Sequence, residues 1–421
     1  MMRRNKGYHY KPYKPARGGY GRSRGPQIRW DRVLPIGGGI LFILILVIVF
    51  NFSRIQCAFK GYSFSQQSDI VALTSDKIDL ILAQDKMDHI STWIDESNRV
   101  SYYDKFEKYY SMHSSMQTKD VVTKVTSIFD NYVPKLKTMG YSTSQVWKVL
   151  KTASTDDLSY LIEHQYSYDT IAPYMAVKGF AFQDMADYIK VYAKKQNYNY
   201  AVLITTYPFI ISSNSTTKHY TIKNPSSYVA LVKKGFYLPT TYEPKDLVTP
   251  GKSDIPVSKD CEHPKLRKQA LKALDEMYVA AKKQGYYLMI NSAYRSYSEQ
   301  KATYSSYEHK YGGLYAAQHV AIPGASEHQT GLGVDLTSQS VEDGTRLVFG
   351  DTAEYKWVCQ NAYRFGYILR FEDGTSKITG ITQEPWHFRY VGTAAAKIIH
   401  EKGWTLEEYC LYEGVLPTLA E

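Results

Sequence analysis

The sequence is poor in cysteine and lacks the short motifs that mark the commonest zinc sites. Its 421 residues contain four cysteines, no CxxC pair and no HExxH. These absences exclude cysteine-rich zinc modules and the helical zinc-protease site, because both place their ligands at those spacings. A single disulfide is compatible with the sequence, and free buried thiols are the alternative. The cysteines concerned are Cys261, Cys359 and Cys410.

Beyond its first 32 residues the chain has almost no excess charge. Residues 1–32 hold ten Lys or Arg against one acid, so they carry +9 of the net +10. The basicity therefore belongs to the tail, and no nucleic-acid partner is expected. The tail is rich in Tyr, Gly and Arg and has no apolar period, so we expect disorder there. A solvated topology signal is its simplest role, and any cytoplasmic partner stays unknown.

An uncharged apolar run follows the tail directly. Residues 33–50 are free of charge, and as a helix they would be about 27 Å long, close to the thickness of a bilayer core. The basic flank places the amino end in the cytoplasm and the rest of the chain outside. A cleaved signal peptide is the alternative, but no small-residue cleavage site follows the run. We therefore expect a single-pass transmembrane helix at 33–52.

The central part of the chain is expected to be a mainly helical extracytoplasmic spacer, residues 53–250. Apolar positions recur at helical spacing from 68 to 116, and Ser142 and Ser154 are good helix caps. Two apolar runs, 200–209 and 227–237, are predicted to be strands. A proline-rich connector then leads to a last domain, residues 251–421. The sequence leaves the purpose of the spacer and the oligomeric state open.

The last domain contains a histidine and an aspartate separated by a glycine-rich turn. His328 and Asp335 are seven residues apart, which on a helix is about 10 Å, too far to share one metal ion. Gly331 and Gly333 lie between them and allow a chain reversal, and residues 333–337 alternate as a strand does. Such a reversal can bring imidazole and carboxylate, two ordinary zinc ligands, to one point.

A second histidine lies in a segment with strand parity. In residues 386–391 the aromatic side chains alternate with His387, so His387 faces away from them. Pro385 holds Glu384 extended beside it, which could place a carboxylate near the imidazole without making it a ligand. This combination suits a catalytic zinc ion with three protein ligands and a nearby base. Three further histidines have no partner at a useful spacing: His263, His309 and His319.

Taken together, these motifs resemble one family of zinc peptidases. SEHQTGLGVD followed by EPWHFRYVG, and preceded by SAYRS, is similar to the pattern of the VanY-type D-alanyl-D-alanine carboxypeptidases and the wider LAS group. The resemblance covers roughly residues 255–400. It implies an α+β zinc peptidase domain built around a small antiparallel sheet.

The resemblance also implies roles for individual residues. Glu384 becomes the general base, and Arg295 steadies the substrate carbonyl as it turns into an oxyanion. Gln300 and Ser326 match positions that hold the substrate, by its terminal carboxylate. Arg370 either binds a carboxylate or makes a structural hydrogen bond. The implied ligands of Zn²⁺ are His328, Asp335 and His387.

The function expected on this basis is hydrolysis of peptidoglycan stem peptides or their precursor at the outer face of the cell membrane. Release of the terminal D-Ala, a D-alanyl-D-alanine carboxypeptidase activity, is the leading expectation. An L,D-endopeptidase with the same zinc site is the first alternative, because the motifs do not show whether the cleft closes behind a terminal carboxylate. A catalytically silent cell-wall binding module is the second alternative, and a complete set of ligands and base argues against it.

Overall fold

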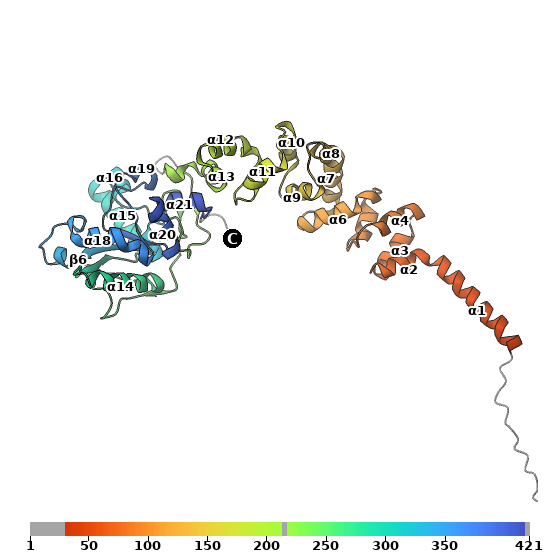
Figure 1. Cartoon of the computed structure of the whole chain (residues 1–421), viewed down its shortest axis with the longest axis horizontal. Helices are drawn as coiled ribbons and strands as arrows, with labels where there is room; N and C mark the ends of the chain where they lie inside the picture. The colour runs from red at the N-terminus through yellow and green to blue at the C-terminus, as the bar shows by residue number, and fades with distance from the viewer. Residues whose placement is uncertain (1–29, 213–216, 417–421) are drawn as a thin grey trace, which may run out of the picture. The chain divides into compact units, whose positions relative to one another are not determined.

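The computed structural model describes residues 30–212 and 217–416 (Figure 1). The described residues form two compact units, one that ends at Asp130 and one that begins at Asn131. The division near 130 does not coincide with the domain boundary expected near 250, which stays a prediction. The predicted disordered tail lies outside the described residues except for its last three positions, which belong to the first helix.

The described part of the first unit is helical, as expected for a spacer. Ser63 caps the amino end of helix α3 and forms a capping box with Gln66. Trp93 is fully buried and donates a hydrogen bond from its indole nitrogen to Glu107, 2.7 Å away. The helices are α1 Trp30–Phe50, α2 Phe52–Phe59, α3 Phe64–Val71, α4 Ser75–Ala83, α5 Ile90–Glu96, α6 Tyr103–Met112 and α7 Thr118–Asn131.

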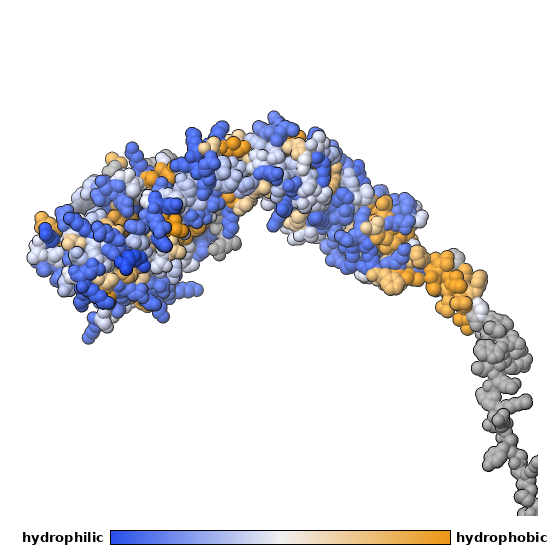
Figure 2. Space-filling view, viewed as in Figure 1, coloured by the Kyte–Doolittle hydropathy of each residue, from blue (hydrophilic) through white to orange (hydrophobic). Residues whose placement is uncertain are grey.

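Helix α1 covers most of the predicted membrane span. Its residues 40–49 are apolar and exposed, and Figure 2 shows them as a hydrophobic stretch. Among the described residues, no single helix has the length and apolarity needed to cross a bilayer. One pair of helices, Gly38–Val49 and Phe52–Phe59, meets both requirements when taken together, with a bend of 67° at the break between them. The transmembrane helix expected at 33–52 is therefore not confirmed.

The second unit begins with six further helices, and one of them corrects the sequence analysis. Residues 200–209, predicted as a strand, instead form most of helix α13 and a 3₁₀ turn, Pro208–Ile211. Asn197 caps α13 by accepting from the Tyr200 amide, and four successive residues, 200–203, are buried. A short run that is buried all round has no period that separates helix from strand. The helices are α8 Val133–Thr138, α9 Thr143–Leu150, α10 Thr155–Glu163, α11 Tyr168–Met175, α12 Met185–Lys195 and α13 Tyr198–Thr206.

The run at 227–237 was also predicted wrongly, because only its last two residues form a strand. That strand, β2 Phe236–Tyr237, pairs in parallel with β1 Tyr220–Thr221. The connector that follows packs against the last domain. The Leu238 amide donates a hydrogen bond to the carbonyl of Gly324, and strand β3 Leu247–Val248 pairs with β4 Leu266–Arg267.

The last domain contains the small antiparallel sheet that the sequence analysis expected. Its four strands lie in the order β5, β6, β8, β7, and every neighbouring pair is antiparallel. The two central strands therefore come from distant parts of the chain. The strands are β5 Leu288–Ser292, β6 Gly333–Ser338, β7 Tyr367–Leu369 and β8 His387–Tyr390.

One face of this sheet forms the hydrophobic core of the domain, and helix α14 lies along it (Figure 1). Val334 and Leu336 of β6 and Phe388 and Tyr390 of β8 are buried in that core together with Met277 of α14. Side chains alternate along a strand, so the residues between them face the opposite side of the sheet. The helices are α14 Lys268–Lys282, α15 Tyr297–Tyr311, α16 Gly313–His319, α17 Gln339–Glu342, α18 Ala353–Asn361, α19 Ser376–Thr379, α20 Thr393–Lys402 and α21 Leu406–Glu413.

Candidate functional site

The face of the sheet opposite the core carries the predicted ligands. Asp335 on β6 and His387 on β8 are direct cross-strand partners, and strand alternation turns both away from the core. His328 lies in a 3₁₀ turn, Glu327–Thr330, immediately before β6. Gly331 follows that turn with a φ of +65°, and an added Cβ would lie 2.7 Å from Leu247. The glycine-rich reversal predicted from the sequence is therefore present.

The three side chains converge. His387 Nδ1 lies 2.8 Å from Asp335 Oδ1, and His328 Nε2 lies 3.5 Å from Asp335 Oδ2. One donor atom from each residue falls within 4.8 Å of the others, and all three residues are nearly buried. Two imidazoles and one carboxylate are a common donor set for zinc.

The outward-facing ring nitrogens also fit a metal site. His328 Nδ1 lies 2.6 Å from the carbonyl oxygen of Ala293, so it carries the proton and Nε2 offers a lone pair to the centre. His387 Nε2 faces Glu327 Oε2 at 3.5 Å and has no hydrogen-bond partner among the described residues. Histidines that bind metals usually turn their other nitrogen to a carbonyl or carboxylate in this way.

The electrostatics of the site favour a positive charge at its centre. Burial lowers the pKa of His328 to about 4, which keeps that ring neutral. Burial alone would also lower the pKa of His387, but Asp335 and Glu327 outweigh it and raise that pKa to about 10. The two carboxylates therefore stabilise a positive charge between them, and a divalent metal ion would supply such a charge. On this chemistry the residues present fit zinc.

Two further predicted residues open into the same cavity, which has a volume of about 560 Å³. Burial raises the pKa of Glu384 to about 7, and its amide donates to the Phe371 carbonyl 3.1 Å away. Arg295 follows strand β5, and its amide donates to the carbonyl of His328 at 3.2 Å. The base and the guanidinium predicted from the sequence thus line the same cavity as the three candidate ligands.

Gln300 and Ser326, predicted to hold the substrate, also line this cavity. The amide of Gln300 is already engaged, because its oxygen accepts from Arg295 at 3.0 Å and its nitrogen donates to Ala321 at 2.7 Å. Arg295 donates in addition to Ser292 at 3.3 Å. The structure therefore gives Gln300 a contact that orients Arg295, and carboxylate binding by Gln300 and Ser326 stays a prediction.

A group of buried charges behind His387 was missed by the sequence analysis. Glu327 lies 2.9 Å from Arg370 Nε and 2.8 Å from Arg389 Nη1. The sequence left open whether Arg370 binds a carboxylate or makes a structural hydrogen bond. In the structure it makes a structural hydrogen bond, to Glu327. Arg389 shares strand parity with His387, a signal that could have indicated that it faces the site.

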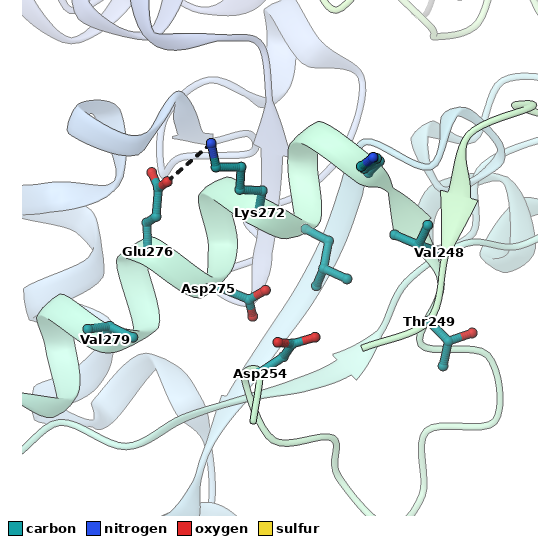
Figure 3. Close-up of a pocket in the computed structure, with 9 residues that line it drawn as sticks. Val248, Thr249, Asp254, Lys272, Asp275, Glu276 and Val279 are labelled. Carbon is teal, nitrogen blue, oxygen red and sulfur yellow. Dashed lines mark ion pairs between the residues drawn. The ribbon is translucent and has the colours of Figure 1, made fainter. Parts of the chain in front are cut away.

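Elsewhere in the described part of the chain, residues do not form a comparable site. All four cysteines lie in the described part of the chain and are free, with Cys57 and Cys410 buried. His263 pairs with Glu299 at 3.1 Å. A second hollow of about 580 Å³ lies beside helix α14 (Figure 3). Its acids, Asp254, Asp275 and Glu276, have no histidine or cysteine beside them in the lining.

Comparison with known proteins identifies one family in the last domain. The VanY family profile, described as D-alanyl-D-alanine carboxypeptidase, matches residues 263–393. The chain is 46% identical over 189 residues to YodJ of Bacillus subtilis, covering 45% of this chain and 69% of YodJ. It is 38% identical over 145 residues to a D-alanyl-D-alanine carboxypeptidase of Enterococcus faecalis, covering 32% of this chain and about half, 52%, of that relative.

Solved structures of similar sequence are known. The LD-carboxypeptidase LdcB is 43% identical, with a TM-score of 0.44, over 47% of this chain and 92% of LdcB. A D,D-pentapeptidase VanY from a VanB-type resistance cassette, solved with Zn(II), is 30% identical, with a TM-score of 0.37, over 43% of this chain and 98% of that protein. From the family profile and the similarity to YodJ, we conclude that the chain belongs to the VanY family of D-alanyl-D-alanine carboxypeptidases.

Proposed function

We propose that this protein is a zinc-dependent carboxypeptidase that removes the terminal D-Ala from peptidoglycan stem peptides or their precursor. One observation carries the proposal: donor atoms of His328, Asp335 and His387 lie within 4.8 Å of one another. They open into the same cavity as an acid, Glu384, and a guanidinium, Arg295. The Enterococcus faecalis relative is named for this activity.

His328 Nε2, Asp335 and His387 Nδ1 would hold the zinc ion. When bound, zinc supplies a Lewis acid that lowers the pKa of water and polarises a peptide carbonyl. Glu384 takes a proton from the attacking water, whose oxygen bonds to the carbonyl carbon. The C–N bond then breaks, and Glu384 passes the proton to the leaving amine. A carboxyl whose pKa is about 7 can both accept and return a proton near neutral pH.

Arg295 stabilises the negative charge that develops on the carbonyl oxygen. Its guanidinium is held by Gln300 and Ser292, so little reorganisation accompanies the reaction. The ligands are buried and Glu384 is half-buried, which limits the access of bulk water to the centre and strengthens these interactions.

We also propose that helix α1 anchors the protein, with its amino end in the cytoplasm and the cavity outside. The support is the exposed apolar stretch at 40–49 together with the basic residues that precede it. An anchored chain should stay in the membrane fraction after an alkaline wash, and protease added to cells without a wall should degrade the carboxyl-terminal domain. Release into the wash would contradict the anchor.

The activity is tested on the purified full chain with zinc and a pentapeptide ending in D-Ala-D-Ala, with the products identified by mass. We expect loss of one alanine, its abolition by a chelator, and its recovery when zinc is added. A tetrapeptide substrate run in parallel tests L,D-carboxypeptidase activity, and intact peptidoglycan tests the endopeptidase alternative. Absence of product from all three substrates would sink the proposed function and favour a silent binding module.

A further inference from the structure

A row of buried ion pairs leads to the candidate metal site. Its two members farthest from that site lie outside the part of the chain that matches the family. Lys233 precedes the matched region, Glu407 follows it, and both are almost completely buried. Lys233 Nζ lies 3.2 Å from Glu407 Oε1. The Glu407 carboxylate accepts from both terminal nitrogens of Arg370, at 2.8 and 3.0 Å. Segments 174 residues apart thus meet at one buried point.

Arg370 connects this point to Glu327 and so to the histidine. Its remaining nitrogen, Nε, donates to Glu327 Oε1 at 2.9 Å. The other oxygen, Oε2, faces His387 Nε2 at 3.5 Å. The row therefore runs from Lys233 through Glu407, Arg370 and Glu327 to the imidazole, with alternating charges along it.

Backbone contacts hold the row in place. Lys233 Nζ also donates to the carbonyls of Ile210 and Ile378. Glu407 lies in the first turn of α21, where Thr405 caps the helix with a capping box. Buried charges with several fixed partners cannot turn elsewhere without leaving one unsatisfied, so their geometry is transmitted along the row.

Glu407 controls how much of the positive charge of Arg370 acts on Glu327. Arg370 lies between two carboxylates, and Glu407 takes two of its hydrogen bonds. Without Glu407 the whole charge of Arg370 would fall on Glu327, which Arg389 also contacts. Glu327 would then hold the Nε2–H of His387 more weakly. A carboxylate that faces Nε2 favours the proton on that nitrogen, which leaves Nδ1 as the free lone pair and increases its donor strength.

We propose that Glu407 is a positioning residue of the metal site, which acts through Arg370 and Glu327 to present His387 Nδ1 to the cation, and that Lys233, paired with Glu407, opposes this effect. The inference rests on the proposed zinc function. It predicts effects of opposite direction for the two residues. Loss of the Glu407 charge makes the surroundings of Glu327 more positive and weakens cation binding. Loss of the Lys233 charge makes them less positive, so cation binding is not weakened.

The test is the zinc affinity of the full-length chain, measured by competition with a chromophoric chelator at neutral pH. Glu407→Gln keeps the size of the side chain and removes its charge, and we expect it to weaken zinc binding roughly tenfold, at the lower end of the range for residues behind a ligand. Lys233→Met should bind zinc at least as tightly as the parent. Thermal unfolding of the metal-free proteins records the loss of stability separately.

Two variants of the same helix serve as controls. Leu411→Ala removes a fully buried apolar side chain from α21 and leaves the ion pairs intact. Glu413→Gln removes an exposed charge from α21. Both should bind zinc as the parent does, although Leu411→Ala should be less stable.

The outcomes separate this inference from the proposed function. A parent chain that binds no zinc overturns both. A parent that binds zinc, with unchanged affinity in Glu407→Gln, overturns only the positioning role. Equal weakening in Glu407→Gln and Leu411→Ala also overturns it, because general loosening of the fold then explains the effect. If Glu407→Gln does not fold, weakened binding in Lys233→Met overturns the inference and retained binding supports it.

Discussion

Asp335 and His387 are direct neighbours across strands β6 and β8, with Oδ1 and Nδ1 2.8 Å apart. Two candidate ligands on adjacent strands of a sheet share the rigidity of its hydrogen-bonded ladder. The third, His328, is brought to them by a short turn and held by the Ala293 carbonyl. A site built on such rigid elements holds its donors in place before a metal ion arrives, which favours tight binding.

Replacement of the proposed base should separate metal binding from catalysis. Glu384 lies in the cavity without belonging to the three-ligand cluster. In Glu384→Gln we expect unchanged zinc content, measured by elemental analysis, and a fall in kcat of roughly 10²- to 10⁴-fold, the usual contribution of general acid–base catalysis. Glu372→Gln, which changes an exposed acid nearby, is the matched control. Retained turnover in Glu384→Gln would contradict its assignment as the base.

Replacement of Gly333 tests how closely the backbone must approach His387. A Cβ added there would lie 3.2 Å from His387 Cε1 and 3.3 Å from Nε2, which is tighter than ordinary contact. Gly333→Ala should therefore displace the ring, weakening zinc binding roughly tenfold and costing about 1–3 kcal/mol of stability. Chelator competition and urea unfolding measure the two effects.

The control for this change is Gly313→Ala, where the added Cβ would meet only the end of the Glu308 side chain at 3.4 Å. It should leave zinc affinity and stability close to those of the parent. Normal zinc affinity in Gly333→Ala would show that the ring can shift without loss of binding.

The sequence could predict that His328, Asp335 and His387 converge because the signals are local. Glycines between His328 and Asp335 indicate a chain reversal, and alternation around His387 indicates which way it faces. The charges behind the site carry no such signal, since Lys233 and Glu407 are 174 residues apart and only tertiary packing joins them. The run at 200–209 was predicted wrongly for a related reason: burial on all sides removed the period that distinguishes a helix.

Gln300 has two possible roles that kinetics can separate. If it binds the terminal carboxylate of the substrate, Gln300→Met should raise KM and leave kcat nearly unchanged. Its hydrogen bonds to Arg295 and Ala321 favour the other result, a fall in kcat of roughly 10- to 100-fold through misplacement of the guanidinium. Because both residues would then act as one unit, Arg295→Lys combined with Gln300→Met should lose little beyond Arg295→Lys alone. Additive losses would contradict the positioning role.

The buried carboxylate of Glu407 should make stability sensitive to acid. Burial alone would raise the pKa of Glu407, but Arg370 and Lys233 outweigh it, so its pKa in the folded chain is below the ordinary value. A group with a lowered folded pKa contributes stability above its unfolded pKa, about 4.3, and loses that contribution as the pH falls through the folded pKa. The metal-free parent should therefore lose stability as the pH falls below that value.

Glu407→Gln should remove part of this dependence. At neutral pH the variant should be less stable than the parent, because Arg370 and Lys233 lose the charge that pairs with them. Below the unfolded pKa the difference should shrink, because protonation removes the same charge from the parent. Urea unfolding of the metal-free chains at a series of pH values measures this convergence, with Glu413→Gln, an exposed acid of the same helix, following the parent throughout. A constant difference between parent and Glu407→Gln at every pH would show that the pairing of this charge does not contribute to stability.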